Sequence, residues 1–168
     1  MIFHFSIGAD DPKRTAKMLA ELWRGEALPF PMLGKGSWVA HAGDDRRSSV
    51  EVYPRDMVLY RGERFGDLRE EPGPRNGPFH AAVATPLTIE EVEEIGRRYG
   101  CGTRVCQRGP WFRVIELWVD DCLMLEMLTP EMQEEYQRNL TRENWHDALT
   151  NVFKLTPEGE PIEDAEAA

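Results

Sequence analysis

The sequence lacks any hydrophobic run that could cross a membrane, and it is poor in positive charge. No apolar stretch approaches the roughly 20 residues that a spanning helix needs. The 20 Lys and Arg residues face 30 Asp and Glu residues, which gives a formal net charge of −10. This balance disfavours partners recognised by their phosphates, so we expect neither nucleic acid nor membrane as a partner. The chain begins on a strand pattern instead of a charged leader, and we expect a cytoplasmic protein.

Cysteine is scarce as well. The only three are Cys101, Cys106 and Cys122, and no Cys-x-x-Cys occurs. An odd count without paired spacing argues against a zinc finger and against a disulfide framework. We therefore expect reduced thiols in one compact domain, for which 168 residues with 41% hydrophobic content are sufficient.

One sequence pattern occurs twice in the chain. Residues 2–10 and residues 77–85 are both short apolar runs that hold a Phe-His pair, with His4 in the first and His80 in the second. Each run is followed by a helix-start signal and then by a glutamate set between apolar residues. The sequence separation is 47 residues from His4 to Glu51 and 46 residues from His80 to Glu126. The repeat predicts two copies of one structural unit.

The first unit, residues 1–54, predicts the order βαβββ. Residues 2–8 alternate as a strand does, and Asp10 and Asp11 before Pro12 predict a helix over 12–24, with Gly25 as its stop. Residues 27–31 hold two prolines, which confine them to a sheet edge or an irregular crossing. Residues 37–42 and 48–53 predict a hairpin.

The second unit, residues 79–129, repeats this order. A strand over 79–84 precedes a capping box, Thr88 to Glu91, and a helix that ends near Gly100. A short strand around 103–107 follows, and then a hairpin of residues 111–119 and 122–128.

Three further segments complete the predicted domain organisation. Residues 55–78 are rich in Gly and Pro and predict a linker loop between the units. Residues 130–155 predict a helical appendage, with helices over 130–139 and from 141 to about 153. Residues 156–168 have little to bury, and we expect a disordered tail.

Strand parity indicates where the repeated residues point. Successive side chains of a strand alternate between the two faces of a sheet. By this count both histidines and both glutamates lie on the less apolar faces of their strands, while the opposite faces pack beneath the two helices. An ionised Glu126 within Leu-Met-Leu-Glu-Met-Leu would be costly to bury alone, and a metal ion would supply its partner. An ordinary ion pair for each glutamate, or a vestigial empty site, is the alternative.

A duplicated βαβββ unit with His on each first strand and Glu on each last strand resembles the vicinal oxygen chelate superfamily, and glyoxalase I is the nearest pattern. The resemblance covers roughly residues 2–129. It implies an α+β fold in which the two units form an open, cleft-bearing barrel. It also implies that His4, Glu51, His80 and Glu126 converge on one divalent metal ion, for which Zn, Ni, Co, Fe and Mn all suit this ligand set.

The resemblance implies a metal-dependent, glyoxalase-like isomerase or lyase that acts on a small molecule, with Glu126 or Glu51 moving a proton beside a metal-bound carbonyl or enediolate. The alternatives are an Fe(II) extradiol-type dioxygenase that uses His4, His80 and Glu126, and a non-catalytic binding or resistance protein. We expect a homodimer.

The remaining candidates are weaker. Arg113, a cation in an apolar strand, and Tyr53, on the face of Glu51, are candidate substrate-binding residues; an ion pair of Arg113 with Glu116 or a rim aspartate is the simpler interpretation. We expect His41 at the rim and His146 on the surface of the appended helices.

Overall fold

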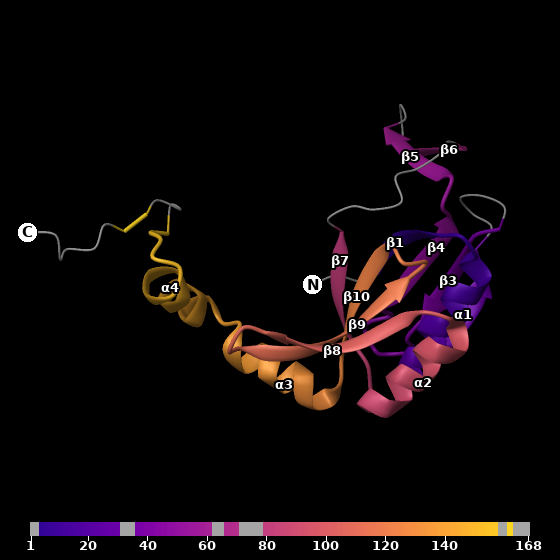
Figure 1. The fold of residues 1–168 in the computed structure, drawn as a ribbon. Helices are drawn as coiled ribbons and strands as arrows, with labels where there is room; N and C mark the ends of the chain where they lie inside the picture. Colours follow the sequence, from indigo (N-terminus) through magenta and orange to yellow (C-terminus); the bar gives the residue numbers. More distant parts are fainter. Residues whose placement is uncertain (1–3, 31–35, 62–65, 71–78, 158–160, 163–168) are drawn as a thin grey trace, which may run out of the picture.

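The two halves of the chain fold into two four-stranded sheets of the same topology (Figure 1). The structure is a computed structural model that describes residues 4–30, 36–61, 66–70, 79–157 and 161–162. In chain order the elements are β1 (His4–Ala9), α1 (Pro12–Trp23), β2 (Glu26–Pro29), β3 (Trp38–His41), β4 (Ser49–Pro54), β5 (Met57–Arg61), β6 (Gly66–Glu70), β7 (His80–Ala84), α2 (Ile89–Tyr99), β8 (Gly102–Arg108), β9 (Phe112–Val119), β10 (Leu123–Leu128), α3 (Pro130–Asn139) and α4 (Arg142–Asn151).

Strand order confirms the predicted repeat. The first sheet runs β1-β4-β3-β2 and the second β7-β10-β9-β8. In each sheet the first strand pairs in parallel with the last strand, and the other neighbours are antiparallel. The fold is therefore α+β, with two βαβββ units side by side. As its two prolines predicted, the segment around residues 27–29 is confined to a sheet edge, where it forms β2.

The helix ends follow the sequence signals closely. The Asp11 side chain caps α1, and Thr88 and Glu91 form the predicted capping box of α2. Gly100 ends α2 in the left-handed conformation. In α1 that conformation falls on Arg24, one residue before the predicted Gly25. Gly25 is instead required for close packing against β3. A Cβ atom at this position would lie 1.9 Å from the carbonyl oxygen of His41, which leaves no room for a side chain.

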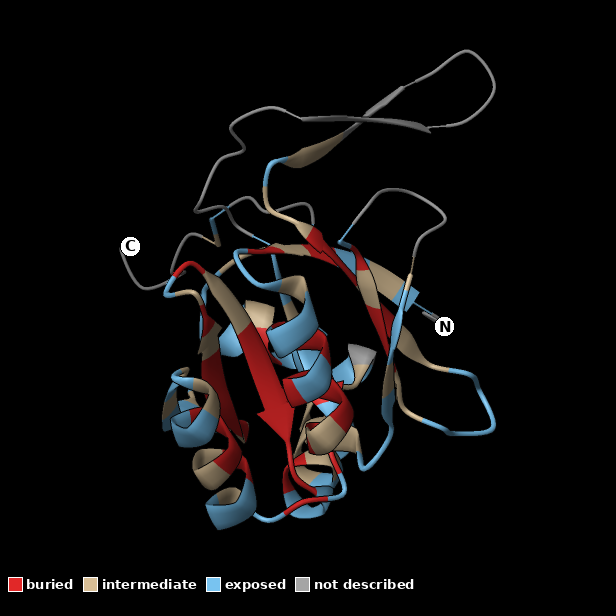
Figure 2. Cartoon of the chain, turned by 90° about the vertical axis from the view of Figure 1, so that its right-hand side faces the viewer, coloured by how far each residue is buried: buried red, intermediate tan, exposed pale blue. Residues whose placement is uncertain are grey.

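The core lies where strand parity predicted it. Val50, Val52, Leu125 and Met127 are fully buried, and they occupy the faces opposite to the glutamates. Figure 2 shows the buried residues gathered on the central strands and on the helix surfaces turned toward them. Helices α1 and α2 lie next to each other, and Arg98 of α2 forms an ion pair with Glu21 of α1.

A buried arginine is one of several polar links between the two halves. Arg55, only 11% exposed, donates to Asp10 and to Asp120, each at 2.6 Å. The backbone N–H of Asp10 also donates to the Asp120 carboxylate at 2.8 Å. On the other side of the junction, the Trp23 indole N–H donates to the Ala84 carbonyl at 2.9 Å. These bonds fix how one sheet is placed against the other.

The connection between the units contains regular structure that the sequence interpretation missed. Within the predicted linker loop, β5 and β6 pair as an antiparallel hairpin that projects from the body (Figure 1). The glycines and prolines of this segment favoured the prediction of a loop. The β-prone residues 57–61 within it favour a strand. Residues 62–65 and 71–78 of the linker lie outside the described residues. β8 is also longer than predicted, at 7 residues.

Both C-terminal helices form as predicted. α3 packs beneath β9, and α4 lies beyond it, away from the sheets (Figure 1). Among the described residues, no helix is long and apolar enough to cross a membrane. Of the predicted tail, residues 158–160 and 163–168 lie outside the described residues, and Ile162 donates its N–H back to the carbonyl of Lys154 at 2.8 Å.

Arg113 anchors α3 to the second sheet. Its backbone N–H and its Nε both donate to the Glu135 carboxylate at 3.0 Å. These hydrogen bonds, the one from the side chain first, hold the pKa of Glu135 below its ordinary value of 4.5, although partial burial opposes them. The pair therefore stabilises the fold above about pH 4.5, and this contribution is lost as the pH falls through the lowered pKa.

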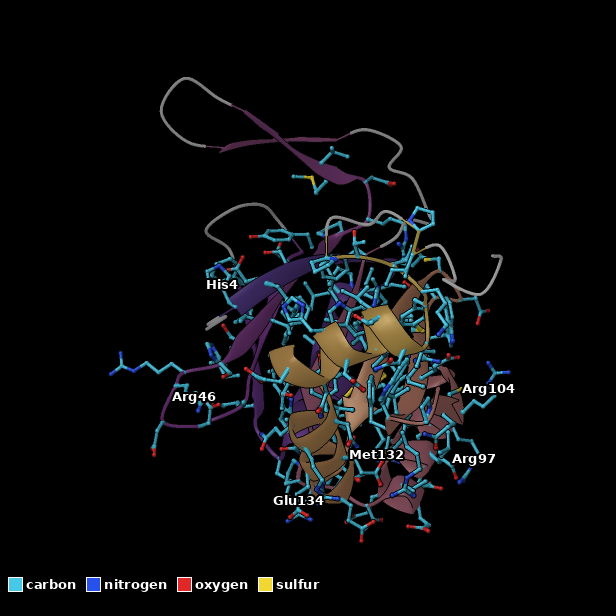
Figure 3. All side chains as sticks on the ribbon, turned by 90° about the vertical axis from the view of Figure 1, so that its left-hand side faces the viewer. His4, Arg46, Arg97, Arg104, Met132 and Glu134 are labelled. Atoms are coloured by element: carbon cyan, nitrogen blue, oxygen red, sulfur yellow. The ribbon has the colours of Figure 1, made fainter. Side chains whose placement is uncertain are left out.

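We expect Glu135→Gln to lower the free energy of unfolding at pH 7 by about 1 kcal/mol, because the pair is only half buried. Urea denaturation of both proteins between pH 7 and pH 3 measures this. The difference should shrink as the pH falls, since the wild-type carboxylate then becomes neutral too. Glu134→Gln, which changes an exposed neighbour on the same helix (Figure 3), is the matched control and should behave as wild type. A difference that stays constant with pH would contradict this role.

Candidate functional site

Each half places its histidine and its glutamate on the same face of its sheet, with the same offset. In the first half Ser6, two residues after His4, pairs with Glu51 across β1 and β4. In the second half Ala82, two residues after His80, pairs with Glu126 across β7 and β10. Since residues directly opposite in a sheet share a face, both His and Glu pairs lie where strand parity predicted them.

Two hydroxyl groups hold the carboxylate of Glu51. The Ser6 hydroxyl donates to its Oε2 at 3.0 Å, and the Tyr53 phenol donates to the same oxygen at 2.8 Å. Burial, and then the hydrogen bond and the negative charge of Glu51, raise the pKa of Tyr53 well above its usual range. The phenol therefore remains a donor, and one carboxylate oxygen is fixed while the other, Oε1, faces His4.

His4 and Glu51 are neighbours on the face that they share. His4 Nε2 lies 4.0 Å from Glu51 Oε1, which is too long for a hydrogen bond. Two ligand atoms bound at about 2.1 Å to one ion stand about 3.0 Å apart at a right angle and about 3.4 Å apart at the tetrahedral angle. The two side chains would therefore have to move closer together to bind one ion in either geometry.

In the second half an arginine holds the carboxylate. Arg108 of β8 donates to Glu126 Oε1 from Nε at 2.9 Å and from Nη2 at 2.6 Å. The same Nη2 lies 3.0 Å from Glu116 Oε1, and Arg104 reaches Glu116 Oε2 at 3.3 Å. Glu116 and Glu126 are each only 8% exposed. The Glu126 carboxylate is therefore hydrogen-bonded to the guanidinium of Arg108.

Arg108 and Glu116 stabilise each other's charged form. Burial raises the pKa of Glu116, but hydrogen bonds from Arg108 and Trp118 outweigh it and bring the pKa below its ordinary value. For Arg108, burial lowers the pKa of the guanidinium. Hydrogen bonds to Glu126 and Glu116 outweigh burial, so this pKa lies above its ordinary value. Both partners are thus ionised at neutral pH, and the cluster is held together by charge-assisted hydrogen bonds.

The two histidines face a shared cleft. A cavity of about 970 Å³ lies between the halves, and His4, His80, Phe5, Phe79 and Tyr136 are among the residues that line it. The rings of Phe5 and Phe79 pack with their centroids 5.9 Å apart, and Phe79 is 49% exposed. Glu51 and Glu126 are not among the described lining residues.

The structure does not bring the four predicted ligands into one cluster. Across the described part of the chain, no three His, Cys, Asp or Glu side chains stand in a metal-holding arrangement. His4 and Glu51 come together, His80 lies on the cleft wall, and Glu126 is paired with Arg108. In Figure 3, His4 and Arg104 lie on opposite sides of the view, and Arg46 projects outward. The four-residue ligand set stays a prediction.

The weaker candidates take definite places. Arg113 forms an ion pair, as one interpretation held, but its partner is Glu135 on α3 and not Glu116. Tyr53 is buried against Glu51. His41 is half-buried on β3, and His146 is exposed on α4. The three cysteines are all free, as expected.

Sequence reasoning missed Ser6, Arg108 and Glu116 as parts of the site. Ser6 shares a strand face with His4, so parity alone could have identified it as a partner of Glu51. Arg108 gave no such signal, because it lies just beyond the predicted short strand and its register on β9 is a tertiary property. Glu116 was considered only as a partner for Arg113.

No protein-family model matches the sequence, and no curated protein matches it either. Solved structures do match. FosX, a fosfomycin resistance protein from Mesorhizobium loti, has 15% identity and a TM-score of 0.50, over 80% of this chain and 95% of its own.

FosX from Listeria monocytogenes, in a complex with Mn(II) and sulfate, has 12% identity and a TM-score of 0.51, over 82% of this chain and 96% of its own. A variant of that protein, in a complex with Mn(II) and 1S,2S-dihydroxypropylphosphonic acid, matches over the same shares with a TM-score of 0.50. At these identities the likeness concerns the fold. The chain has the fold of the vicinal oxygen chelate superfamily, to which the FosX proteins belong.

Proposed function

We propose that the chain is a divalent-metal-dependent enzyme of the vicinal oxygen chelate type. Its proposed reaction is that of a glyoxalase-like isomerase or lyase, which moves a proton beside a carbonyl or enediolate of a small molecule. The observation that carries the proposal is the shared register: both histidines stand two residues before the partner of a glutamate, on a common face. The same offset in both halves supports a shared role for the two pairs.

The proposed ligands are His4, Glu51, His80 and Glu126. The common face of His4 and Glu51 supports the first pair, and the common cleft supports His80. Imidazole and carboxylate donors suit Zn, Ni, Co, Fe or Mn. FosX of Listeria monocytogenes was crystallised with Mn(II), which makes manganese one reasonable choice to test here.

A bound divalent ion would polarise the substrate oxygens and make the adjacent proton more acidic. The chain's own residues divide the remaining work. Glu51 is the better proton acceptor of the two glutamates, because Ser6 and Tyr53 fix one of its oxygens and leave the other toward the His4 side. Glu126 is restrained by Arg108 and is less able to exchange protons.

The same contacts weigh against the dioxygenase alternative. An Fe(II) site of two histidines and one carboxylate would use His4, His80 and Glu126, and it would leave Glu51 outside the set. Here Glu51 lies beside His4, whereas Glu126 is held by Arg108. The third alternative, a non-catalytic binding protein, draws support from the aromatic cleft alone.

Protein purified without a chelator should contain about one divalent ion per chain. Changing His80→Ala together with Glu126→Ala should abolish this binding, because two of the proposed ligands are then lost. Elemental analysis by plasma mass spectrometry measures the ion. His146→Ala, which changes an exposed histidine on α4, is the control and should retain the metal. A fully occupied ion in the double variant would refute the site.

Loss of the proposed base should separate the two chemistries. The metal-loaded protein should catalyse deuterium exchange at carbon in a panel of small α-hydroxyketones, and Glu51→Gln should slow this exchange by about 10²-fold or more. NMR in D₂O follows the exchange. Oxygen uptake by the Fe²⁺-loaded protein with a panel of catechols is the opposing test. Oxygen uptake that persists in the Glu51→Gln protein would favour the dioxygenase.

We also propose that the chain forms a homodimer through the rim of the cleft. The half-exposed phenyl ring of Phe79 beside Phe5 is the kind of apolar surface that a second copy would cover. Light scattering should give the mass of two chains, and Phe79→Asp should give one. Phe153→Asp, at a comparably exposed phenylalanine beyond α4, should leave the mass unchanged. A monomeric wild type would contradict this proposal.

A further inference from the structure

The cleft extends beyond the two histidines along the whole of one strand. β7 is an edge strand of its sheet, and all eight consecutive residues 79–86 line the cleft. Both faces of a strand border one cavity where that cavity runs along the strand's open edge. On the face of His80, the strand carries only the small side chains of Ala82 and Ala84, and both are exposed. At about 3.3 Å per residue, the cleft is open for about 13 Å from His80 to Ala84.

Helix α3 forms the end of the cleft that lies away from His80. Gln133 and Tyr136 stand about one turn apart on α3, and both line the cleft. The Gln133 Nε2 donates to the carbonyl of Thr85, just after β7, at 3.1 Å. It also donates to the carbonyl of Leu128, at the end of β10, at 2.9 Å. These two hydrogen bonds fix the Gln133 side chain at the point where β7 ends.

Gln133 has only its carbonyl oxygen left for a ligand. A side-chain amide has two N–H donors and one oxygen acceptor, and both donors are used by the carbonyls of Thr85 and Leu128. Only the NH₂ group can bind two carbonyl oxygens, so the orientation of the amide is determined. Within the described ranges, no group donates a hydrogen bond to Gln133 Oε1. This end of the cleft therefore contains a fixed acceptor.

Tyr136 adds a donor beside that acceptor. Its ring packs edge-on against Phe112 with the centroids 4.8 Å apart, which holds the ring in place. Its hydroxyl has no hydrogen-bond partner in the part of the chain that the structure describes. Among the described side chains, the oxygen that is both buried and unpartnered is that of Ser37, so the Tyr136 hydroxyl and Gln133 Oε1 are both open to solvent.

We propose that Gln133 and Tyr136 bind a neutral carboxamide at one end of an elongated ligand. Gln133 Oε1 accepts from the N–H of that group, and the Tyr136 hydroxyl donates to its carbonyl. The apolar body of the ligand lies along β7 and reaches the rings of Phe5 and Phe79 at the histidine end. The inference rests on the proposed function in one respect, that the ligand is a substrate whose reacting part lies near His80. Gln133 and Tyr136 are then specificity-determining residues.

A matched pair of probes tests the acceptor without altering the protein. In 8-phenyloctanamide a phenyl ring and a carboxamide stand at opposite ends of a flexible chain, and 9-phenylnonan-2-one has a methyl group in place of the NH₂. We expect the amide to bind with a Kd about fivefold lower than the ketone, because only the amide donates to Gln133. NMR titration of the labelled full chain gives both Kd values. Intermolecular NOEs from the probe's amide to the Tyr136 ring should place that end at α3.

Two variants assign the hydrogen bonds to their residues. Tyr136→Phe keeps the ring against Phe112 and should raise both Kd values about fivefold, because both probes have a carbonyl. Gln133→Leu should make the two Kd values equal. Tyr99→Phe, at a half-buried tyrosine outside this cleft, is the control and should change neither Kd by more than about twofold. If Gln133→Leu does not fold, the NOEs in the wild type locate the amide.

Equal Kd values in the wild type would overturn the proposal, and so would a preference for the amide that persists in Gln133→Leu. Failure of both probes to bind, or NOEs that place the amide beside Phe79, would overturn it as well. The metal content of the same samples tests the proposed function separately. A protein without metal that still prefers the amide contradicts the proposed enzyme alone, whereas a metal-containing protein without this preference contradicts the carboxamide site alone.

Discussion

The parallel pairing of the first and last strands in each half is the constraint on which the site depends. Parallel neighbours cannot be joined by a tight turn. In each unit a helix and two further strands therefore connect the first strand to the last, which pairs beside it. The return brings a residue near position 50 of each unit next to the first strand. A histidine at the beginning and a glutamate at the end thus share a face, although more than 40 residues separate them.

What lies beside that pair is free to differ between the halves. The outer strand does not take part in the parallel pairing, and its length and residues can change without disturbing it. β2 has only 4 residues and ends at Pro29, which has no N–H to donate to the ladder. β8 has no proline and pairs with β9 from Phe112 to Trp118. One outer strand therefore leaves Glu51 among hydroxyls, and the other delivers a guanidinium to Glu126.

Much of this architecture was readable from the sequence, because it follows from local rules. The alternation around His4 and His80, the capping box at Thr88, and the apolar residues opposite the glutamates each report on a few neighbouring positions. The partner of Arg113 was not readable in that way, since Glu135 lies on a helix 22 residues further on. Nor was the role of Arg108, because the register of an edge strand depends on the sheet it joins. The hairpin of β5 and β6 was hidden by the glycines and prolines around it.

The placement of one half against the other is the least local property, and it decides how near the two histidines come to the two glutamates. Arg55 controls it by binding one aspartate from each half, Asp10 after β1 and Asp120 at the β9–β10 turn. Because this arginine is nearly buried, its two hydrogen bonds cannot be exchanged for water without leaving a charge uncompensated. These contacts join the two halves at Arg55, and His4 and His80 line the cleft between the halves. Within this frame Arg108 restrains the Glu126 side chain by hydrogen bonds at 2.9 Å and 2.6 Å, whereas neutral hydroxyl groups hold Glu51.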